Sequence, residues 1–206
     1  MRRLLALVAL VLVGSIGNAH AAVITFEDLP VDPVGTPGGD RTSSGFLFDT
    51  LVDHSHIDDG TSWGTGNGTN IMVIDAFGTA NNVTFSPIGG GPFALTKIDL
   101  SKANTFSTTS AQSVEVTANL LGGGTVSTTL ALASNFNFTT FMFDSSWTNL
   151  SSVSLNGIGA TCCGQLPGNY YAIDNIVVAA VPEPGTLSLF GLGTAYVISR
   201  RRRSRR

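Results

Sequence analysis

Residues 113–132 read SVEVTANLLGGGTVSTTLAL, and this stretch decides the fold class. Val114, Val116 and Ala118 alternate with polar residues, so their apolar side chains fall on one face of an extended strand. Residues 125–132 repeat the alternation after three glycines, which can form a tight turn. The stretch therefore predicts a β-hairpin with one buried face and one hydrated face.

Short alternating segments of the same kind recur on both sides of this hairpin, bounded by Gly, Asn and Pro. No long stretch has a helical period, and no internal repeat is visible. We expect an all-β fold, an antiparallel β-sandwich of the jelly-roll type. Besides 114–120 and 126–132, strands are expected at residues 23–26, 46–52, 71–77, 83–85, 93–100, 136–143, 153–155 and 171–178.

The C-terminal end carries a different pattern. Residues 181–186 read VPEPGT, a mostly apolar and uncharged segment follows at 187–199, and arginines dominate the last residues. Proline ends a strand, an apolar segment crosses lipid only as a helix, and arginines stay on the cytoplasmic side. At about 1.5 Å per residue this helix is shorter than a lipid core of about 30 Å. We therefore expect a single transmembrane helix that anchors weakly.

This order of elements resembles the PEP-CTERM sorting signal of exported bacterial proteins, also catalogued as an ice-binding-protein C-terminal domain. The resemblance covers residues 181–206, with Val181, Pro182, Glu183 and Pro184 as its motif. It implies recognition by an exosortase-type membrane protease and cleavage near the motif. The protein would be held transiently in the inner membrane and then reach the cell surface or extracellular matrix. An ordinary tail anchor without processing is the alternative.

The N-terminal end has the parts of a secretory signal peptide. Two arginines precede an apolar segment at 4–13, and AHA at 19–21 offers a cleavage site with small residues. We expect residues 1–21 to be removed during export by the secretory pathway. Residues 22–180 then form one β-sandwich domain, and residues 181–206 form the sorting signal.

The charge of the domain differs from that of the whole chain, which is −3. Once both terminal signals are set aside, three basic residues remain against thirteen acidic ones, a balance of about −10. Such a domain repels nucleic acid and anionic membranes and favours divalent cations. Nucleic-acid binding is therefore excluded.

The middle of the chain more loosely resembles the jelly-roll domains common in PEP-CTERM proteins, which are similar to carbohydrate-binding modules. The resemblance depends on FED at 26–28, a Gly/Asn-rich central loop and AIDNIVV at 172–178. If the first and last strands pair, Glu27, Asp28 and Asp174 come together and suit a structural calcium ion. The family resemblance points to the same ion. Alternatively, Asp174 points outward or bonds a neighbouring loop.

His54 and His56 lie in the sequence DHSHIDDG, the densest group of possible transition-metal ligands. In an extended segment both imidazoles project to the same side, where Asp58 or Asp59 could complete a zinc or copper site. The alternative is a solvated turn after the preceding strand, with Asp-Asp-Gly at its tip.

Cys162 and Cys163 are adjacent, and they are the chain's two cysteines. Their Cα atoms are about 3.8 Å apart, below the usual disulfide range, so a bridge between them needs a distorted peptide. Because an oxidising compartment disfavours free thiols, a strained disulfide or cross-links to other chains remain open. The CxxC spacing of redox motifs is absent.

Trp63 is the residue with which we most expect a sugar to make contact. It lies in GTSWGTGNGTN, a polar loop where a core tryptophan is less expected, and its flat ring could stack on a pyranose. Trp147, Tyr170 and Tyr171 are weaker candidates, and Trp147 is expected in the core. Burial of Trp63 in the core is the competing interpretation.

Signatures of enzymes are missing: the chain has no Gly-x-Ser-x-Gly elbow, Walker sequence or Ser-x-x-Lys. The sequence therefore favours a non-catalytic, exported surface or extracellular-matrix protein, with exopolysaccharide as a candidate ligand. A hydrolase of matrix glycans is one alternative, because thirteen acids could include a catalytic pair. A metal-stabilised surface protein without sugar affinity is the other.

Overall fold

A computed structural model of the chain describes residues 21–33, 38–50, 55–61, 65, 67–74, 82–103, 110–159, 161–162, 166–167 and 169–181. All of these except Val181 belong to one compact unit, residues 20–180. The apolar segment at 187–199 and almost all of the leader lie outside the described residues. No helix in the described part is long and apolar enough to cross a membrane.

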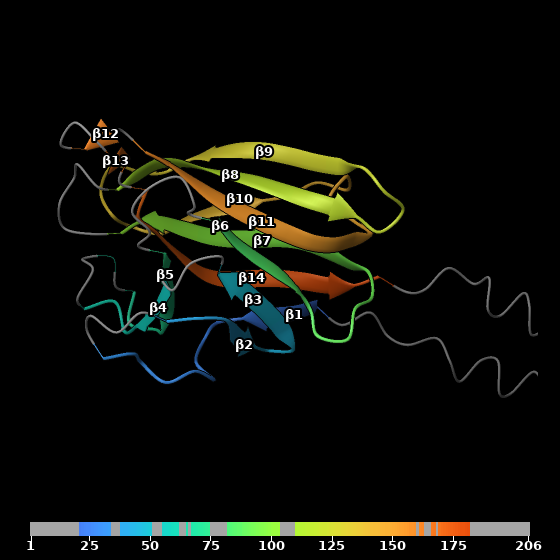
Figure 1. Ribbon diagram of the computed structural model, residues 1–206, viewed down its shortest axis with the longest axis horizontal. Coiled ribbons are helices and arrows are strands. Elements are labelled where there is room, and N and C mark those ends of the chain that lie inside the picture. The colour runs from blue at the N-terminus through green and yellow to red at the C-terminus, as the bar shows by residue number, and fades with distance from the viewer. Residues whose placement is uncertain are drawn as a thin grey trace, which may run out of the picture. The chain divides into compact units, whose positions relative to one another are not determined.

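The described residues form strands and turns (Figure 1). The strands are β1 (Ala21–Ile24), β2 (Arg41–Ser43), β3 (Phe46–Thr50), β4 (Ser55–Asp58), β5 (Ile71–Ile74), β6 (Asn82–Pro87), β7 (Phe93–Lys102), β8 (Ala111–Leu120), β9 (Thr125–Ala131), β10 (Thr139–Met142), β11 (Leu150–Gly159), β12 (Thr161–Cys162), β13 (Leu166–Pro167) and β14 (Tyr171–Ala180). Apart from the small pair β12–β13, the strands join one 12-stranded sheet in which every strand pair is antiparallel.

This sheet divides into two layers that meet at a single pair, Leu150 with Phe93. The β11 layer has the order β2-β3-β6-β11-β8-β9. In the β14 layer, β10 pairs with β7, and β7 pairs with β14. The other edge of β14 pairs with β1 and with β5, and β5 pairs in turn with β4. The chain passes from one layer to the other at most of its connections, as sandwich and jelly-roll winding requires.

The two layers are held together by their apolar inner faces. Phe46 of the β11 layer and Phe93 of the β14 layer pack edge to face, with ring centroids 5.3 Å apart. Phe85 lies 6.0 Å from the same Phe93 ring. The buried Tyr171 hydroxyl donates a hydrogen bond of 3.0 Å to the carbonyl oxygen of Leu155 in the opposite layer. Burial raises the pKa of Tyr171, which keeps the phenol protonated as a donor.

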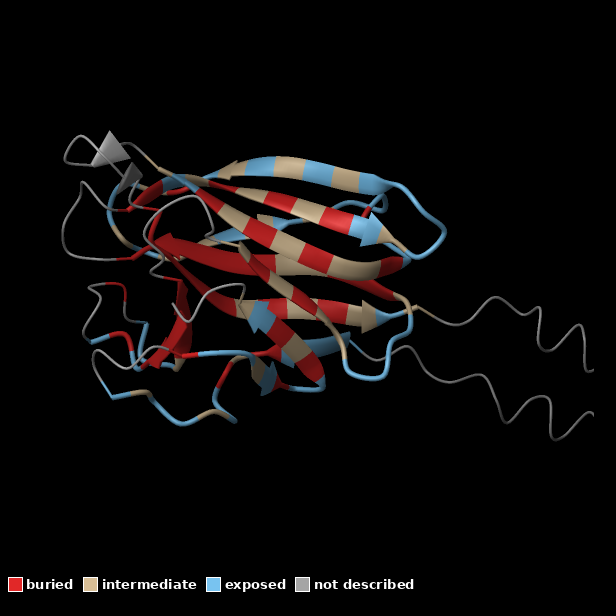
Figure 2. Ribbon diagram, viewed as in Figure 1, coloured by how far each residue is buried: buried red, intermediate tan, exposed pale blue. Residues whose placement is uncertain are grey.

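Alternation of buried and half-buried residues is visible along β8 and β11 (Figure 2). The predicted hairpin is confirmed: β8 pairs with β9 along its length, and Gly123 and Gly124 adopt φ values of 91° and 89° in the connection. These positive values favour glycine, because a side chain would be strained there. The all-β antiparallel class is confirmed, and each expected strand has a counterpart.

One local prediction is wrong, and further strands were not predicted. Residues 136–138 do not belong to a strand, because Phe136 has a φ of 57° and the Asn135 side chain accepts a hydrogen bond from the Asn137 N–H. For residues 55–58 the sequence left an extended segment and a solvated turn open, and they form the extended strand β4, whose four residues are all buried. The expected turn begins only at Asp59. Edge strand β2 was also not predicted.

Gly157 of β11 is predicted to be essential for close packing between the layers. A Cβ atom there would lie 2.5 Å from the carbonyl oxygen of Asn169 and 2.9 Å from the Tyr171 ring. Gly157→Ala should therefore lower stability by about 1–3 kcal/mol, a loss of several degrees in the melting midpoint. Gly122→Ala is the matched control, since nothing lies within 4 Å of its added Cβ. Equal midpoints in the two variants would contradict this packing.

Candidate functional site

The first and last strands pair as predicted: β1 and β14 are antiparallel, with Ile24 opposite Ile176. Near this seam, carboxylates from both ends of the domain hold the loop segment 67–70. Glu27 accepts a hydrogen bond of 2.7 Å from the Asn70 N–H. Asp174 accepts hydrogen bonds from the Asn67 amide at 2.7 Å and the Thr69 hydroxyl at 3.0 Å.

Asp174 is fully buried at an irregularity of β14. The register of β14 against β7 shifts between Asp174 and Val177, and Asn175 there has a φ of 45°. The Asn175 N–H and side-chain amide donate two further hydrogen bonds to the Asp174 carboxylate. Burial raises its pKa, and the donors from Asn67, Asn175 and Thr69 oppose that shift.

Asp99 of β7 lies directly opposite Asp174 and contributes to the rise in its pKa. Two carboxylates opposite each other on neighbouring strands repel one another. Lys97, with its ammonium 3.2 Å from the Asp99 carboxylate, and a 2.7 Å hydrogen bond from Thr140 offset this repulsion. The cluster is therefore a balanced polar network on the outer side of the β14 layer.

Asp28 takes part in a different contact. It accepts a hydrogen bond of 2.6 Å from the Ser43 hydroxyl and one of 2.9 Å from the Ser44 N–H, at the turn between β2 and β3. Partial burial acts to raise the pKa of Asp28, but these two donors lower it below its ordinary value.

The three predicted calcium ligands thus accept hydrogen bonds from three separate sets of donors. Among the described residues, no three His, Cys, Asp or Glu side chains form a group that could hold a metal ion. This arrangement matches the alternative in which Asp174 bonds a neighbouring loop. Calcium binding by Glu27, Asp28 and Asp174 stays a prediction that titration can test.

The histidine-rich segment is partly described. His54 lies outside the described residues, whereas His56 is buried in β4. Asp58 accepts a hydrogen bond from the Gly60 N–H, and Asp59 accepts two from Thr61. These hydrogen bonds form the turn expected from Asp-Asp-Gly, placed directly after β4.

Of the remaining predicted site residues, some lie within the described part of the chain and some do not. Trp63, Cys163 and the motif residues Pro182, Glu183 and Pro184 lie outside the described residues. The backbone of Cys162 belongs to β12, and Val181 directly follows β14. Trp147 is buried, with its ring 4.6 Å from that of Phe143, so its placement in the core is confirmed. Tyr170 and Tyr171 are buried too, which removes them as sugar contacts.

The outer side of the β11 layer is a surface that sequence reasoning did not single out. Strand pairing aligns short polar side chains in rows across neighbouring strands, and we call these rows the polar face. The rows are Thr84–Ser154–Thr117–Ser127, Asn82–Asn156–Glu115–Thr129 and Ser152–Asn119–Thr125.

Hydroxyl and amide groups on the polar face can both donate and accept hydrogen bonds. They repeat about every 4.8 Å across the strands and about every 6.7 Å along them, as the geometry of a sheet requires. Thr84 and Ser154 are joined by a hydrogen bond of 2.7 Å, and the Asn119 amide donates to Ser152 at 3.0 Å. Glu115 of β8 is charged, and Asp49 of β3 continues the first row beyond Thr84. In the sequence, this face corresponds to the polar residues that alternate with apolar ones along each strand.

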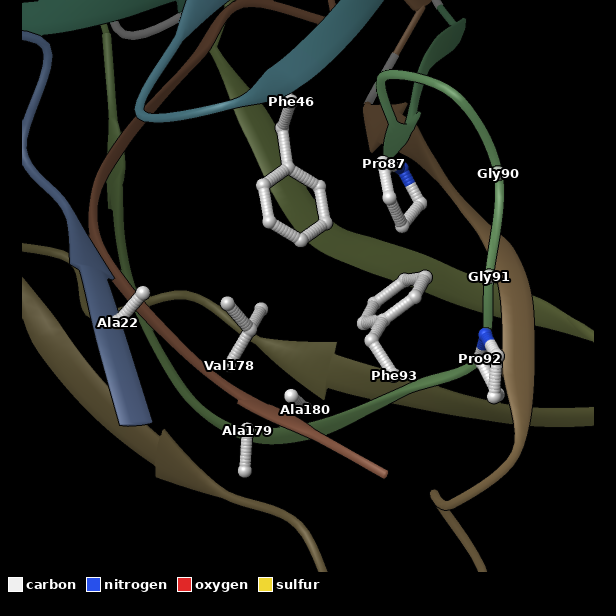
Figure 3. Close-up of a pocket in the computed structure, with 10 residues that line it drawn as sticks. All are labelled: Ala22, Phe46, Pro87, Gly90, Gly91, Pro92, Phe93, Val178, Ala179 and Ala180. Atoms are coloured by element: carbon white, nitrogen blue, oxygen red, sulfur yellow. The ribbon is translucent and has the colours of Figure 1, made fainter. Parts of the chain in front are cut away.

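A pocket of about 260 Å³ lies at the end of the sandwich where β1 begins and β14 ends (Figure 3). The rings of Phe46 and Phe93 lie next to each other in its wall, and Val178 lies between β1 and those rings. Its lining has no polar side chain, so it offers nothing for acid–base or nucleophilic chemistry. The lining residues are Ala22, Phe46, Pro87, Gly90, Gly91, Pro92, Phe93, Val178, Ala179 and Ala180.

Comparison with known proteins identifies the C-terminal signal. The PEP-CTERM protein-sorting motif matches residues 180–203, which confirms the predicted sorting signal. No curated protein matches the chain.

Three solved structures are distantly similar to the chain. A family 29 carbohydrate-binding module from Piromyces equi is 10% identical, with 80% of this chain and 92% of that chain covered, and a TM-score of 0.45. A family 32 module of NanJ from Clostridium perfringens, in complex with galactose, is 11% identical, with 78% of this chain and 99% of that chain covered, and a TM-score of 0.37. A DUF4465 family protein from Bacteroides ovatus is 10% identical, with 79% of this chain and 99% of that chain covered, and a TM-score of 0.41. At these scores, the similarities assign the domain neither a ligand nor a function.

Asp174 is predicted to hold the 67–70 segment on the domain. Asp174→Ala removes the acceptor of four hydrogen bonds and leaves buried donors unsatisfied, so stability should fall by about 2–3 kcal/mol. Hydrogen exchange should then be faster at residues 67–70, whereas Asp144→Ala, which loses hydrogen bonds only within its own exposed turn, should leave exchange at 67–70 unchanged.

Thermal melting with calcium and with chelator shows whether Asp174 stabilises the domain through its hydrogen bonds alone or also through a bound calcium ion. A midpoint that chelator lowers in wild type but not in Asp174→Ala would support a bound ion. Full stability of Asp174→Ala would contradict the role of the carboxylate in holding the loop.

Proposed function

We propose that this chain, which carries a PEP-CTERM sorting motif over residues 180–203, is an exported protein that an exosortase-type protease delivers to the cell surface or extracellular matrix. The motif is the single observation that carries this proposal. It begins where β14 ends at Ala180, so cleavage there would release the complete β-sandwich. Val181, the first residue beyond β14, is half-buried.

We further propose that the sandwich is non-catalytic and binds neutral exopolysaccharide through the polar face. A polysaccharide presents hydroxyl groups at regular intervals, and the rows of the polar face present matching donors and acceptors. The rows contain no Lys or Arg, and the domain charge of about −10 opposes anionic chains. These features together support a neutral glycan as the ligand.

The spacing of the carboxylates on this layer argues against a hydrolase that works there. Asp49 of β3 lies opposite Thr84, in the row of Ser154, while Glu115 lies on β8. Three strand spacings separate β3 from β8, a distance of about 14 Å. Glycosidases place their two carboxyl groups about 5–10 Å apart. Binding without cleavage is therefore the function that this face supports best.

Removal of hydroxyl groups from the polar face should weaken glycan retention. Thr84→Val with Thr117→Val keeps the side-chain shape and the preference for strands but deletes two hydrogen-bonding groups. We expect about tenfold weaker binding to the native exopolysaccharide, with the melting midpoint lowered by only a few degrees through loss of the Thr84–Ser154 hydrogen bond. Thr148→Val, in an exposed turn outside the rows, is the matched control.

Trp63→Ala tests the other proposed contact, the polar loop on which the sequence places a stacking ring. If Trp63→Ala loses retention while the double valine variant keeps it, the site lies on that loop and not on the polar face. If wild type binds no glycan, the sugar-binding function is wrong, although the sorting proposal stands. Release of new reducing ends from the glycan would establish the hydrolase instead.

The sorting motif should be required for processing. Replacing Pro182, Glu183 and Pro184 by alanine removes the recognised motif, so full-length protein should accumulate in the inner membrane. Wild type should lose its arginine-rich tail in the same cells, as intact-mass measurement can show. An uncleaved wild type would indicate a simple anchor.

A further inference from the structure

β9 is a free edge of the β11 layer that lacks the protection of the other edges. It lies along the upper side of the sandwich in Figure 1, and β8 is its partner among the described strands. At seven residues, Thr125–Ala131, it is longer than the edge strands β1, β2, β4 and β10. An edge strand presents unpaired N–H and C=O groups that can pair with another chain.

The edge of β4 shows how this protein covers such groups elsewhere. Asp32 donates its N–H to the Ile57 carbonyl at 2.8 Å, and its side chain accepts the Ile57 N–H at 2.8 Å. Gly38 forms a bridge with Ser55 at the other end of the strand. The opposite edge of the β11 layer, β2, has three residues and includes Arg41, which pairs with Asp32.

β9 has none of these devices. Its sequence TVSTTLA contains no charge, proline or glycine, and Thr and Val favour extended structure. Its pairing with β8 runs from Ser113–Ala131 to Asn119–Thr125 without a register shift, so no bulge turns the edge away. The nearest charge across the ladder is Glu115, opposite Thr129.

The hydrogen bonds to β8 identify which groups of β9 point outward. The Leu132 N–H donates to the Gln112 carbonyl, and the Leu120 N–H donates to Gly124. Hydrogen-bonded pairs alternate along an antiparallel ladder, so Val126, Thr128 and Leu130 use their N–H and C=O groups towards β8. The backbone groups of Thr125, Ser127, Thr129 and Ala131 therefore point to the free side.

These outward groups fit a second copy of β9 in antiparallel orientation about Thr128. Ser127 then faces Thr129 of the other copy, and Thr125 faces Ala131, so outward N–H and C=O groups meet in register. On the inner side Val126 faces Leu130, and both are only partly buried against the core of the domain. The second copy would cover them with the same two apolar residues.

We propose that the protein forms a twofold symmetric dimer through β9, in which the two β11 layers join into one continuous sheet. The contact is isologous, because each strand meets the same strand of its partner. The self-complementary register favours a second copy over an unrelated strand. A single strand pair is smaller than a standard interface of about 1,600 Å², so the dimer is weak and forms at micromolar concentration. This proposal does not depend on sugar binding.

Cysteine cross-linking of the full chain tests the register, in a background with Cys162→Ser and Cys163→Ser. Two Thr128 residues face each other in a pair without mutual hydrogen bonds, with Cα atoms about 4.5 Å apart, so Thr128→Cys should form a disulfide dimer. Ser127→Cys is the matched control. Its two copies lie diagonally, about 7–8 Å apart, and should give no dimer band.

Light scattering of the full chain in mild detergent tests the interface itself. Ser127→Lys with Thr129→Lys places like charges opposite each other and should abolish the dimer, whereas Thr42→Lys on the opposite edge should leave it intact. A wild type that stays monomeric up to about 100 micromolar overturns the proposal. So does equal cross-linking by the two cysteine variants, an outcome that stands even if the lysine variant fails to fold.

Discussion

The packing of two apolar inner faces against each other is the constraint on which the rest of the structure depends. Phe46 and Phe93 meet across the layers, and the Tyr171 hydroxyl reaches the Leu155 carbonyl from the opposite side. Because side chains alternate along a strand, burying one set of residues sends the intervening set outward. The register that fills the core therefore also aligns the rows of the polar face. A slip of one residue would exchange the two faces.

β14 departs from this regularity at one place, where the register shifts after Asp174. A buried carboxylate opposite Asp99 is unfavourable unless donors and a cation surround it. The structure supplies donors from Asn67, Thr69 and Asn175, and Lys97 pairs with Asp99. The irregular strand therefore attaches a loop from the middle of the chain to its last strand. Trp63, the sugar contact expected from the sequence, precedes the held segment by four positions along the chain.

Alternation predicted the strands well, because it reports directly which side chains the core buries. The hairpin of residues 113–132 and the pairing of first with last strand followed from that signal and from family resemblance. Prediction failed where local chemistry competes with alternation. Phe136 reads as part of a strand, yet its neighbour Asn135 bonds the Asn137 N–H and turns the chain. The polar half of each strand was visible in the sequence, but its alignment into rows could not be predicted, since rows across strands depend on long-range register.

The polar face and the free edge are coupled by the geometry of the sheet. If β9 pairs with its own copy, the row that ends at Ser127 continues into the row of Thr129 in the second copy. Two polar faces then lie in one sheet, where each can bind the same glycan chain. Binding of the second face becomes intramolecular, so weak single contacts can produce strong retention. A surface or matrix protein with neutral, hydroxyl-rich contacts gains from such an arrangement, because each hydrogen bond to a sugar replaces one to water and contributes little alone.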